Sequence, residues 1–386
     1  MTKSSPFPLW GAGLVKSFPS PLWGGVRGGG KRPARLVTAL LCDSTGKAAA
    51  FTRSLLCAAI LALPIAAAHS AARAEPAPIE RMEVTTRPIT RFEIGRSRTR
   101  FGPLDFVGGL EMVSSGRNFG GFSAMRFMTP GRDFIGVADT GFWFFGQVTR
   151  DAGQRPSGIS NFRMVRMLDE DGKPVEGKWK ADAESLAVKD GTATVGFERN
   201  HRIAQFHIDP DNMQAPFRKL DFLVPKHELR INRGFETVAY SPAGSALKGA
   251  LVAVSERSLD PRGNVFAAVL DGPRKGVFTV VRSDDFDITD GAFLPNGDLL
   301  LLERSFSVLK GVRMRLRRLP ADSIGKGKVA DGPVLMQADM NHQIDNMEAM
   351  DVWRRADGAL IVSLMSDDNR SFLQRSLYLE FLLSGE

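Results

Sequence analysis

Five copies of one short pattern recur between residues 123 and 369. In each copy a first segment starts with an acidic residue or a serine, a turn follows, and a β-rich run then ends in an acidic residue. The copies start at residues 123, 184, 236, 290 and 348, so they lie 61, 52, 54 and 58 residues apart. That spacing is too long for solenoid repeats and suits the four-stranded blades of a propeller. We therefore predict an all-β chain that forms a single β-propeller of five or six four-stranded blades with a central acid-lined channel.

Turn sequences within the copies predict where the hairpins lie. Asn296-Gly297, Asp357-Gly358 and Asp190-Gly191 each separate two β-rich segments, and such pairs favour tight hairpin turns. Each turn joins the first strand of a copy to the second. The acidic residues at the start of the first strand and at the end of the second therefore fall at the same end of the hairpin. Since the first strand of a blade lines the channel, we expect a ring of acids around one channel mouth.

The two ends of the repeat region predict how the ring of blades closes. We expect strands near residues 89–94 and 106–112 to pair with the C-terminal run 376–383. A closing blade made from both termini favours six blades, whereas the five copies by themselves suggest five. Both blade numbers stay open on the sequence.

Residues 1–74 differ from the rest of the chain in charge. They hold nine of the 51 Lys and Arg residues and one acid, Asp43, so the whole formal charge of +8 lies here. The apolar run 55–68 follows Arg53 and precedes Ala72-Arg73-Ala74, which is the order of a secretory signal peptide. We expect cleavage near Ala74 and a periplasmic or secreted protein. Residues 1–50 are then a disordered extension, a long twin-arginine leader, or the product of a miscalled start.

The remaining residues, 75–386, form the predicted propeller domain, and their charges balance at 42 basic and 42 acidic residues. Non-specific binding to nucleic acid needs a surplus of cations, so we expect no nucleic-acid partner. Both cysteines, Cys42 and Cys57, precede this domain, which excludes disulfides, thiolate metal sites and cysteine nucleophiles within it. The apolar run 55–68 is too short to span a membrane, and no second apolar segment follows it. We expect a monomer.

Paired motifs in the five copies carry a family resemblance over roughly residues 86–386. They are Gly120-Gly121-Phe122-Ser123 with Val137-Ala138-Asp139, Asp182-Ala183-Glu184-Ser185-Leu186 with Phe197-Glu198-Arg199, Asn232-Arg233-Gly234-Phe235-Glu236 with Ser255-Glu256-Arg257, Asp287-Ile288-Thr289-Asp290 with Glu303-Arg304, and Asn346-Met347-Glu348 with Asp367-Asp368-Asn369. In these residues the chain resembles the family described as esterase-like activity of phytase, periplasmic β-propeller proteins that carry a phytase-like domain. The resemblance implies a propeller, divalent-metal binding, and hydrolysis of phosphomonoesters or other esters.

Nine acidic residues make up the predicted ring. They are Glu184, Glu236, Asp290 and Glu348 at the starts of the inner strands, and Asp139, Glu198, Glu256, Glu303 and Asp367 at the ends of the partner strands. Like charges at such distances repel unless a cation lies between them. Calcium suits a shell of oxygen ligands, and it would polarise a phosphate or a water molecule. The alternative is a purely structural ring in which the acids pair with arginines of neighbouring blades.

Four arginines are candidates for binding an anionic substrate: Arg199, Arg233, Arg257 and Arg304. Planar guanidinium groups bind phosphate and carboxylate well. The alternative is that these arginines only neutralise the acids.

Two functions of different class follow from these residues. The first is an exported, metal-dependent hydrolase of phosphate esters or carboxyl esters, which acts on a small anionic substrate and has Glu184, Glu236, Asp290 and Glu348 as its catalytic candidates. The second is a non-catalytic, calcium-stabilised propeller that binds a partner in the cell envelope. The acid ring serves both, so the sequence leaves both open.

Overall fold

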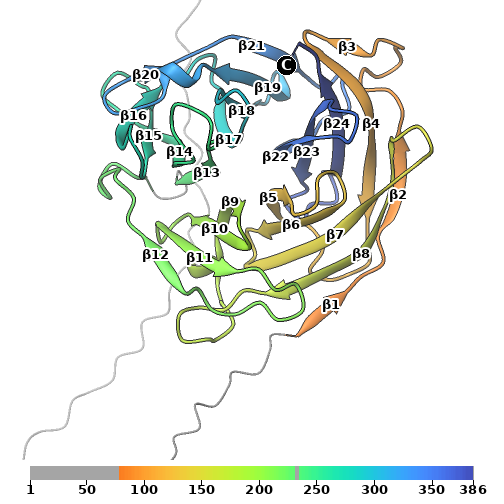
Figure 1. The fold of residues 1–386 in the computed structure, drawn as a ribbon. Helices are drawn as coiled ribbons and strands as arrows, with labels where there is room; N and C mark the ends of the chain where they lie inside the picture. The colour runs from red at the N-terminus through yellow and green to blue at the C-terminus, as the bar shows by residue number, and fades with distance from the viewer. Residues whose placement is uncertain (1–77, 231–233, 386) are drawn as a thin grey trace, which may run out of the picture. The chain divides into compact units, whose positions relative to one another are not determined.

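Five mainly antiparallel sheets form a five-bladed β-propeller in the computed structural model (Figure 1). The structure describes residues 78–230 and 234–385. The predictions of a leader and of cleavage near Ala74 lie outside the described residues. Within the described residues no helix is long and apolar enough to cross a membrane.

The first two blades follow the chain from the centre to the rim. The first contains β5 (Phe122–Phe127), β6 (Asp133–Ala138), β7 (Phe142–Arg150) and β8 (Pro156–Arg166), with β1 (Ile79–Arg81) paired to β8 at its outer edge. A short helix, α1 (Lys178–Ala181), precedes the second blade, which contains β9 (Ala183–Lys189), β10 (Thr192–Phe197), β11 (Arg202–His207) and β12 (Arg218–Leu220).

The third and fourth blades repeat this order and share a connecting segment. The third contains β13 (Phe235–Tyr240), β14 (Leu251–Leu259), β15 (Val265–Val269) and β16 (Gly276–Val280). The fourth contains β17 (Asp287–Phe293), β18 (Leu299–Ser307), β19 (Gly311–Leu319) and β21 (Val334–Ala338). Between β19 and β21 the chain forms a 3₁₀ turn at Ala321–Ser323 and the strand β20 (Val329–Ala330), which pairs in parallel with β16 of the third blade. This segment ties the two blades together at their outer edge.

The fifth blade closes the ring with strands from both ends of the described chain. It contains β22 (Asn346–Arg354), β23 (Leu360–Asp367) and β24 (Ser376–Leu383), followed outward by β4 (Leu104–Val113) and β2 (Thr85–Ile89), while β3 (Arg100–Phe101) pairs with β4. The predicted pairing of residues 106–112 with 376–383 is confirmed by the β4–β24 register. The closing blade completes the fifth copy of the repeat, so the described residues form five blades and no sixth.

The strand predicted near residues 89–94 lies upstream of that range, since only Ile89 belongs to β2, and it pairs with β4 and not with the C-terminal run 376–383. After Ile89 the chain leaves the sheet and inserts Phe92 into the core. The Phe92 ring packs edge-on against Phe101 and Phe381, with ring centroids 5.0 and 4.9 Å apart. Burial of this aromatic side chain fixes where the strand ends.

The predicted hairpin turns join the first and second strands of three blades. Asp190 and Gly191 connect β9 to β10 with φ values of +48° and +71°, and Gly297 and Gly358 have φ values of +95° and +88° in the turns of the fourth and fifth blades. These left-handed conformations are the ones that Gly and Asx residues adopt at least cost. All three turns lie at one end of the inner hairpins, so the starts of the inner strands lie at the other end.

The aromatic run Phe142-Trp143-Phe144-Phe145 in β7 shows how neighbouring blades pack. Trp143 contacts Phe206 of the second blade, with ring centroids 5.0 Å apart. Phe144 lies on the opposite face of the sheet and packs against Phe122. Because successive side chains of a strand point to opposite faces, one strand fills two layers of the core. The resulting apolar layers between blades hold the inner strands in place around the channel.

Candidate active site at the channel mouth

Each inner strand has a β-bulge close to its start, and this bulge places one residue toward the channel mouth. The strand pairing shifts register around Ser123, Glu184, Glu236, Thr289 and Glu348. A bulge adds one unpaired residue and re-aims its side chain. Four of the five bulge residues line one cavity: Glu184, Glu236, Thr289 and Glu348. The fifth, Ser123, is buried, and its hydroxyl lies 3.5 Å from the carbonyl oxygen of Gly121.

A second set of side chains comes from the ends of the partner strands. In each inner hairpin, the residue before the bulge pairs with a residue of the second strand, and the next residue of that strand is Asp139, Glu198, Glu256, Arg304 or Asp367, in the order of the blades. All five line the same cavity as the bulge residues. The cavity has a volume of about 140 Å³ and is completed by Lys178 and Asn369. Its described lining therefore holds seven carboxylates and two cationic side chains.

The fourth blade departs from the predicted ring by one residue in both strands. The sequence pattern assigned Asp290 and Glu303 to the ring, but the bulge residue is Thr289 and the residue at the end of the partner strand is Arg304. Neither Asp290 nor Glu303 lines the cavity. A one-residue shift along a strand turns a side chain to the opposite face of the sheet, which is why both carboxylates leave the mouth.

Asp290 and Glu303 are buried in ion pairs away from the cavity. Asp290 accepts two hydrogen bonds of 2.7 Å from the guanidinium of Arg126. Glu303 accepts hydrogen bonds of 2.5 Å from Arg315 and Arg317, which are at most 2% exposed. These two acids pair with arginines, as in the structural alternative, but not with arginines of neighbouring blades: Arg315 and Arg317 belong to the same blade as Glu303, and Arg126 belongs to a blade that is not adjacent.

A sequence signal for the shift exists in the residue that precedes each bulge. The bulge residues follow Phe122, Ala183, Phe235, Ile288 and Met347, all of which are apolar and buried. In the fourth copy the apolar residue is Ile288, so the ring position is the next residue, Thr289. Alignment on the apolar residue, in place of the acid, would have found Thr289.

Four of the cavity carboxylates, Glu184, Glu236, Glu348 and Asp367, have raised pKa values. Burial, followed by the neighbouring charges of Asp182, Glu348 and Glu198, raises the pKa of Glu184 well above its ordinary value. Burial and the charges of Glu184 and Glu198 do the same to the pKa of Glu236. Both effects disfavour the charged form, so the cavity needs a cation to keep its acids ionised at neutral pH.

Arg304 is the guanidinium that the fourth blade contributes to the ring. Its Nη1 atom lies 3.4 Å from Oε1 of Glu348 and donates a hydrogen bond to Asn346, and its Nη2 atom lies 3.9 Å from Oε1 of Glu256. Burial alone would lower the pKa of Arg304, but the carboxylates of Glu348 and Glu256 raise it above its ordinary value. Arg304 is therefore charged and partly neutralises one side of the cavity.

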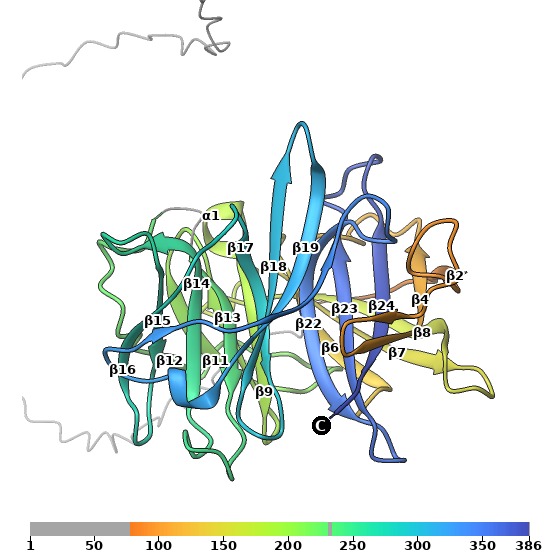
Figure 2. The same ribbon diagram turned by 90° about the horizontal axis from the view of Figure 1, so that it is seen from above.

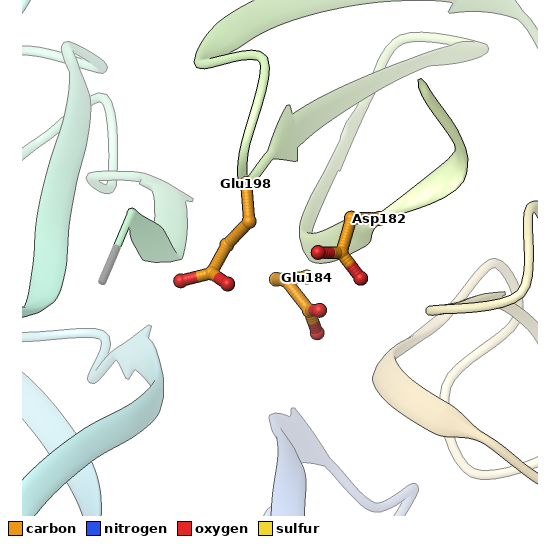
Figure 3. Close-up of side chains that lie close together, drawn as sticks. All are labelled: Asp182, Glu184 and Glu198. Carbon is orange, nitrogen blue, oxygen red and sulfur yellow. The ribbon is translucent and has the colours of Figure 1, made fainter. Parts of the chain in front are cut away.

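Two groups of three carboxylates could each hold a metal ion. Asp182, Glu184 and Glu198 form one group, in which one ligand oxygen per residue lies within 4.8 Å of the others (Figure 3). Glu198, Glu236 and Glu256 form the second group by the same criterion, so Glu198 belongs to both. The predicted ring omitted Asp182, although it precedes β9 and is 1% exposed. The sequence analysis also did not identify Lys178 as a cation of the cavity; its Nζ atom lies 3.0 Å from Oδ2 of Asp139.

The predicted arginines are not all in the cavity. The Nε atom of Arg199 donates a hydrogen bond of 2.6 Å to Asp182, and the φ value of Arg199 is +50°. This left-handed conformation breaks the alternation of the strand, so Glu198 and Arg199 both reach the same region. The Nη1 atom of Arg257 lies 3.4 Å from Oδ2 of Asp287, outside the lining of the cavity. Arg233 lies outside the described residues.

The fold and the mouth define the chain as a five-bladed β-propeller with an acidic, oxygen-rich cavity. The model of the family described as esterase-like activity of phytase matches residues 117–370, and the chain belongs to this phytase-like family. The comparison with curated proteins gives no match.

Solved structures similar to the chain are distant. An endo-arabinase from Bacteroides thetaiotaomicron is 11% identical, with 69% of this chain and 94% of the arabinase covered and a TM-score of 0.43. The PQQ-bound aldose sugar dehydrogenase from Streptomyces coelicolor is also 11% identical, with 78% and 98% covered and a TM-score of 0.36.

Proposed function

We propose that the protein is an exported, calcium-dependent hydrolase of small anionic phosphate esters or carboxyl esters, with its active site in the acidic cavity. The observation that carries the proposal is the cavity itself, where seven carboxylates and two cationic side chains line about 140 Å³. Membership of the phytase-like family supports an ester as the substrate. The sequence of residues 53–74, which has the order of a signal peptide, supports export.

The chemistry of the ligand atoms fits calcium. All candidate ligands are carboxylate oxygens, which hard cations prefer, and the two groups of three offer room for a flexible coordination shell. The Oδ1 atom of Asp182 is buried and accepts no hydrogen bond from the described residues. An ion held by Asp182, Glu184 and Glu198 would satisfy this atom. Glu198, Glu236 and Glu256 would hold a second ion.

Calcium bound at the mouth would supply a Lewis acid that polarises an ester oxygen and a water molecule. The chain's own residues position the substrate around that centre. Arg304 presents a charged guanidinium from the fourth blade, suited to a phosphate or carboxylate oxygen. A neighbouring pocket of about 690 Å³ shares Arg304 with the cavity and is also lined by Arg257, Arg282 and Arg313. It can hold the remainder of an anionic substrate.

Glu348 is the candidate for proton transfer among the predicted catalytic residues. Glu184 and Glu236 belong to the two metal-binding groups, and Asp290 is paired with Arg126. Glu348 belongs to neither group of three, and its carboxylate accepts a hydrogen bond of 2.7 Å from Asn346. Burial raises the pKa of Glu348, against the opposing charge of Arg304. A carboxyl group with a raised pKa is a better proton acceptor than an ordinary carboxylate, which suits a general acid or base.

A non-catalytic, calcium-stabilised envelope-binding module is the second candidate. The ion pairs within the mouth favour it, because Lys178 already contacts Asp139 and Arg304 already contacts Glu348. In that function the cavity would hold calcium to stabilise the propeller, and another surface would bind the partner.

Hydrolysis assays on the full chain test the two functions. We propose to screen chromogenic phosphomonoesters, phosphodiesters and carboxyl esters, each with calcium and with a chelator. The hydrolase proposal expects turnover of at least one class that requires calcium and is lost in Glu348→Gln. Asp351→Asn is a suitable control, because Asp351 is on the same strand but does not line the cavity. Calcium-dependent stability without turnover of any ester would favour the binding module.

A further inference from the structure

Three projections lie on the channel-mouth side of the propeller (Figure 2). The hairpin that joins β18 to β19 extends well beyond the neighbouring strands on this side, and the loop between β23 and β24 and the helix α1 lie on the same side. Each projection is connected directly to the cavity. Arg304 lies in β18, Asp367 ends β23, and Asp182 follows α1.

Two of these projections expose large apolar side chains almost completely, and Trp179 on α1 is 55% exposed. Val308 and Leu309 are 93% and 97% exposed at the tip of the β18–β19 hairpin, and Phe372 is 96% exposed in the β23–β24 loop. Side chains this exposed have few neighbours, so they form no wall of a pocket for a small molecule. Their exposure in water is unfavourable, which indicates a partner that surrounds them from outside.

Each apolar tip carries a cationic side chain close by in the sequence. Lys310 follows Leu309, Arg370 lies two residues before Phe372, and Trp179 on α1 is followed by Lys180. Lys310, Arg370 and Lys180 are all exposed. Apolar and aromatic residues beside Lys or Arg are typical of segments that lie in a membrane interface, where the apolar group enters the acyl boundary and the cation contacts anionic headgroups.

The opposite face of the propeller has a different character. Its inner hairpins end in polar turns such as 190–191, 296–297 and 357–358. Among the described residues, the strongly exposed large apolar side chains include none in these turns. One face of the molecule is therefore apolar and basic at its projections, while the turns of the other are polar.

We propose that the mouth face docks on the surface of a phospholipid membrane that contains anionic lipid. Val308, Leu309, Phe372, Leu373 and Trp179 enter the interface, and Lys310, Arg370 and Lys180 contact headgroup phosphates. A planar bilayer can contact all three projections at once, because they lie on one face of the molecule. A protein partner would need a complementary pocket for each of them. The proposal is independent of hydrolysis, and it would place the acidic cavity next to the headgroup layer.

Vesicle flotation with the full chain tests the proposal. The probes are vesicles of phosphatidylcholine alone and vesicles that also contain phosphatidylglycerol. We expect binding to the mixed vesicles and, for Val308→Ser combined with Leu309→Ser, at least about tenfold weaker binding, because two apolar side chains no longer enter the interface. The matched control is Val329→Ser combined with Val334→Ser, two valines that are exposed on the outer strands of the blades. The control should bind like the unmodified chain.

Hydrogen exchange of the vesicle-bound chain locates the membrane contact. It distinguishes binding through the three projections from binding through the apolar run 55–68. We expect slower amide exchange in residues 306–310 and 370–374 and unchanged exchange in the turn 294–298. Flotation without slower exchange at these tips would overturn the proposal, because another segment would then bind the vesicles. Failure of the folded, unmodified chain to bind mixed vesicles would also overturn it and favour a protein partner. If Lys310→Glu with Arg370→Glu bound mixed vesicles as tightly as the unmodified chain, the headgroup contacts would be excluded.

Discussion

Arg126 and Asp290 form a bidentate ion pair that joins the inner strands of two blades that are not neighbours. Both N–O distances are 2.7 Å, and the pair connects β5 of the first blade with β17 of the fourth. The intervening fifth blade takes part through Met350, whose carbonyl accepts a hydrogen bond from Arg126 and whose N–H donates one to Asp290. The three blades are thus held together by one buried polar network.

Removal of one partner of this pair should destabilise the propeller strongly. Asp290→Asn leaves the Arg126 guanidinium, which is 6% exposed, without its counter-ion. We expect a loss of about 3–5 kcal/mol in the free energy of unfolding, as for other buried pairs that lose one partner. Denaturant titration measures the loss. Arg126→Met combined with Asp290→Leu should lose less than Asp290→Asn, since no charge is left buried, and a larger loss would contradict this account.

Calcium should stabilise the folded chain. A ligand that binds only the folded state adds RT ln(1 + [L]/Kd), or about 2.7 kcal/mol at a hundredfold excess over Kd. We expect calcium to raise the melting temperature of a preparation freed of metal, and a chelator to reverse the rise. No change in the melting curve on either addition would mean that the described side chains balance the cavity charge without an ion.

The same Glu→Gln substitution should have opposite effects inside and outside the cavity. In metal-free buffer, Glu184→Gln relieves repulsion among the cavity acids, so stability should hold or rise by roughly 1 kcal/mol, while calcium affinity falls. Glu303→Gln is the matched control. It removes a charge that pairs with Arg315 and Arg317 at 2.5 Å, so it should lower stability and leave calcium affinity unchanged. Thermal melts and calcium titrations of both variants decide between metal ligand and structural ion pair.

Metal-free stability should fall with rising pH through the contribution of Glu184 and Glu236. Burial and neighbouring acids raise the pKa of each in the folded state well above 4.5. From the unfolded pKa up to the raised folded pKa, the unfolded state has lost these protons and the folded state has kept them. Stability therefore decreases as pH rises across this interval and levels off above the folded pKa. The double variant Glu184→Gln, Glu236→Gln should show a flatter dependence in pH-dependent melts, and an identical slope would contradict the shifts.

Arg304 should matter for anionic esters more than for neutral ones. Arg304→Gln removes the guanidinium that lies beside the carboxylates of Glu348 and Glu256 in the cavity. We expect kcat/KM for an anionic ester to fall by about a hundredfold, the size of a charge-assisted contact, with a smaller fall for a neutral carboxyl ester. Arg257→Gln, at the rim beside Asp287, should have a weaker effect. Equal losses on both ester types would assign Arg304 a structural role.

The repeat pattern alone determined the propeller and most of its mouth. Apolar alternation and the Asn-Gly and Asp-Gly turns are local features, and they predict strands, hairpins and the common end at which the carboxylates gather. Glu184, Glu236, Glu348, Asp139, Glu198, Glu256 and Asp367 line the cavity as the pattern placed them. The sequence left five and six blades open, and the pairing of the closing strands within the fifth blade decided for five.

The tertiary structure decided which carboxylates leave the ring. The bulge in the fourth blade falls on Thr289, so Asp290 turns away to Arg126 of a distant blade and Arg304 takes the place of an acid. These choices depend on register and on partners far apart in the chain, where a shift of one residue reverses the face of a strand and no local pattern records the partner.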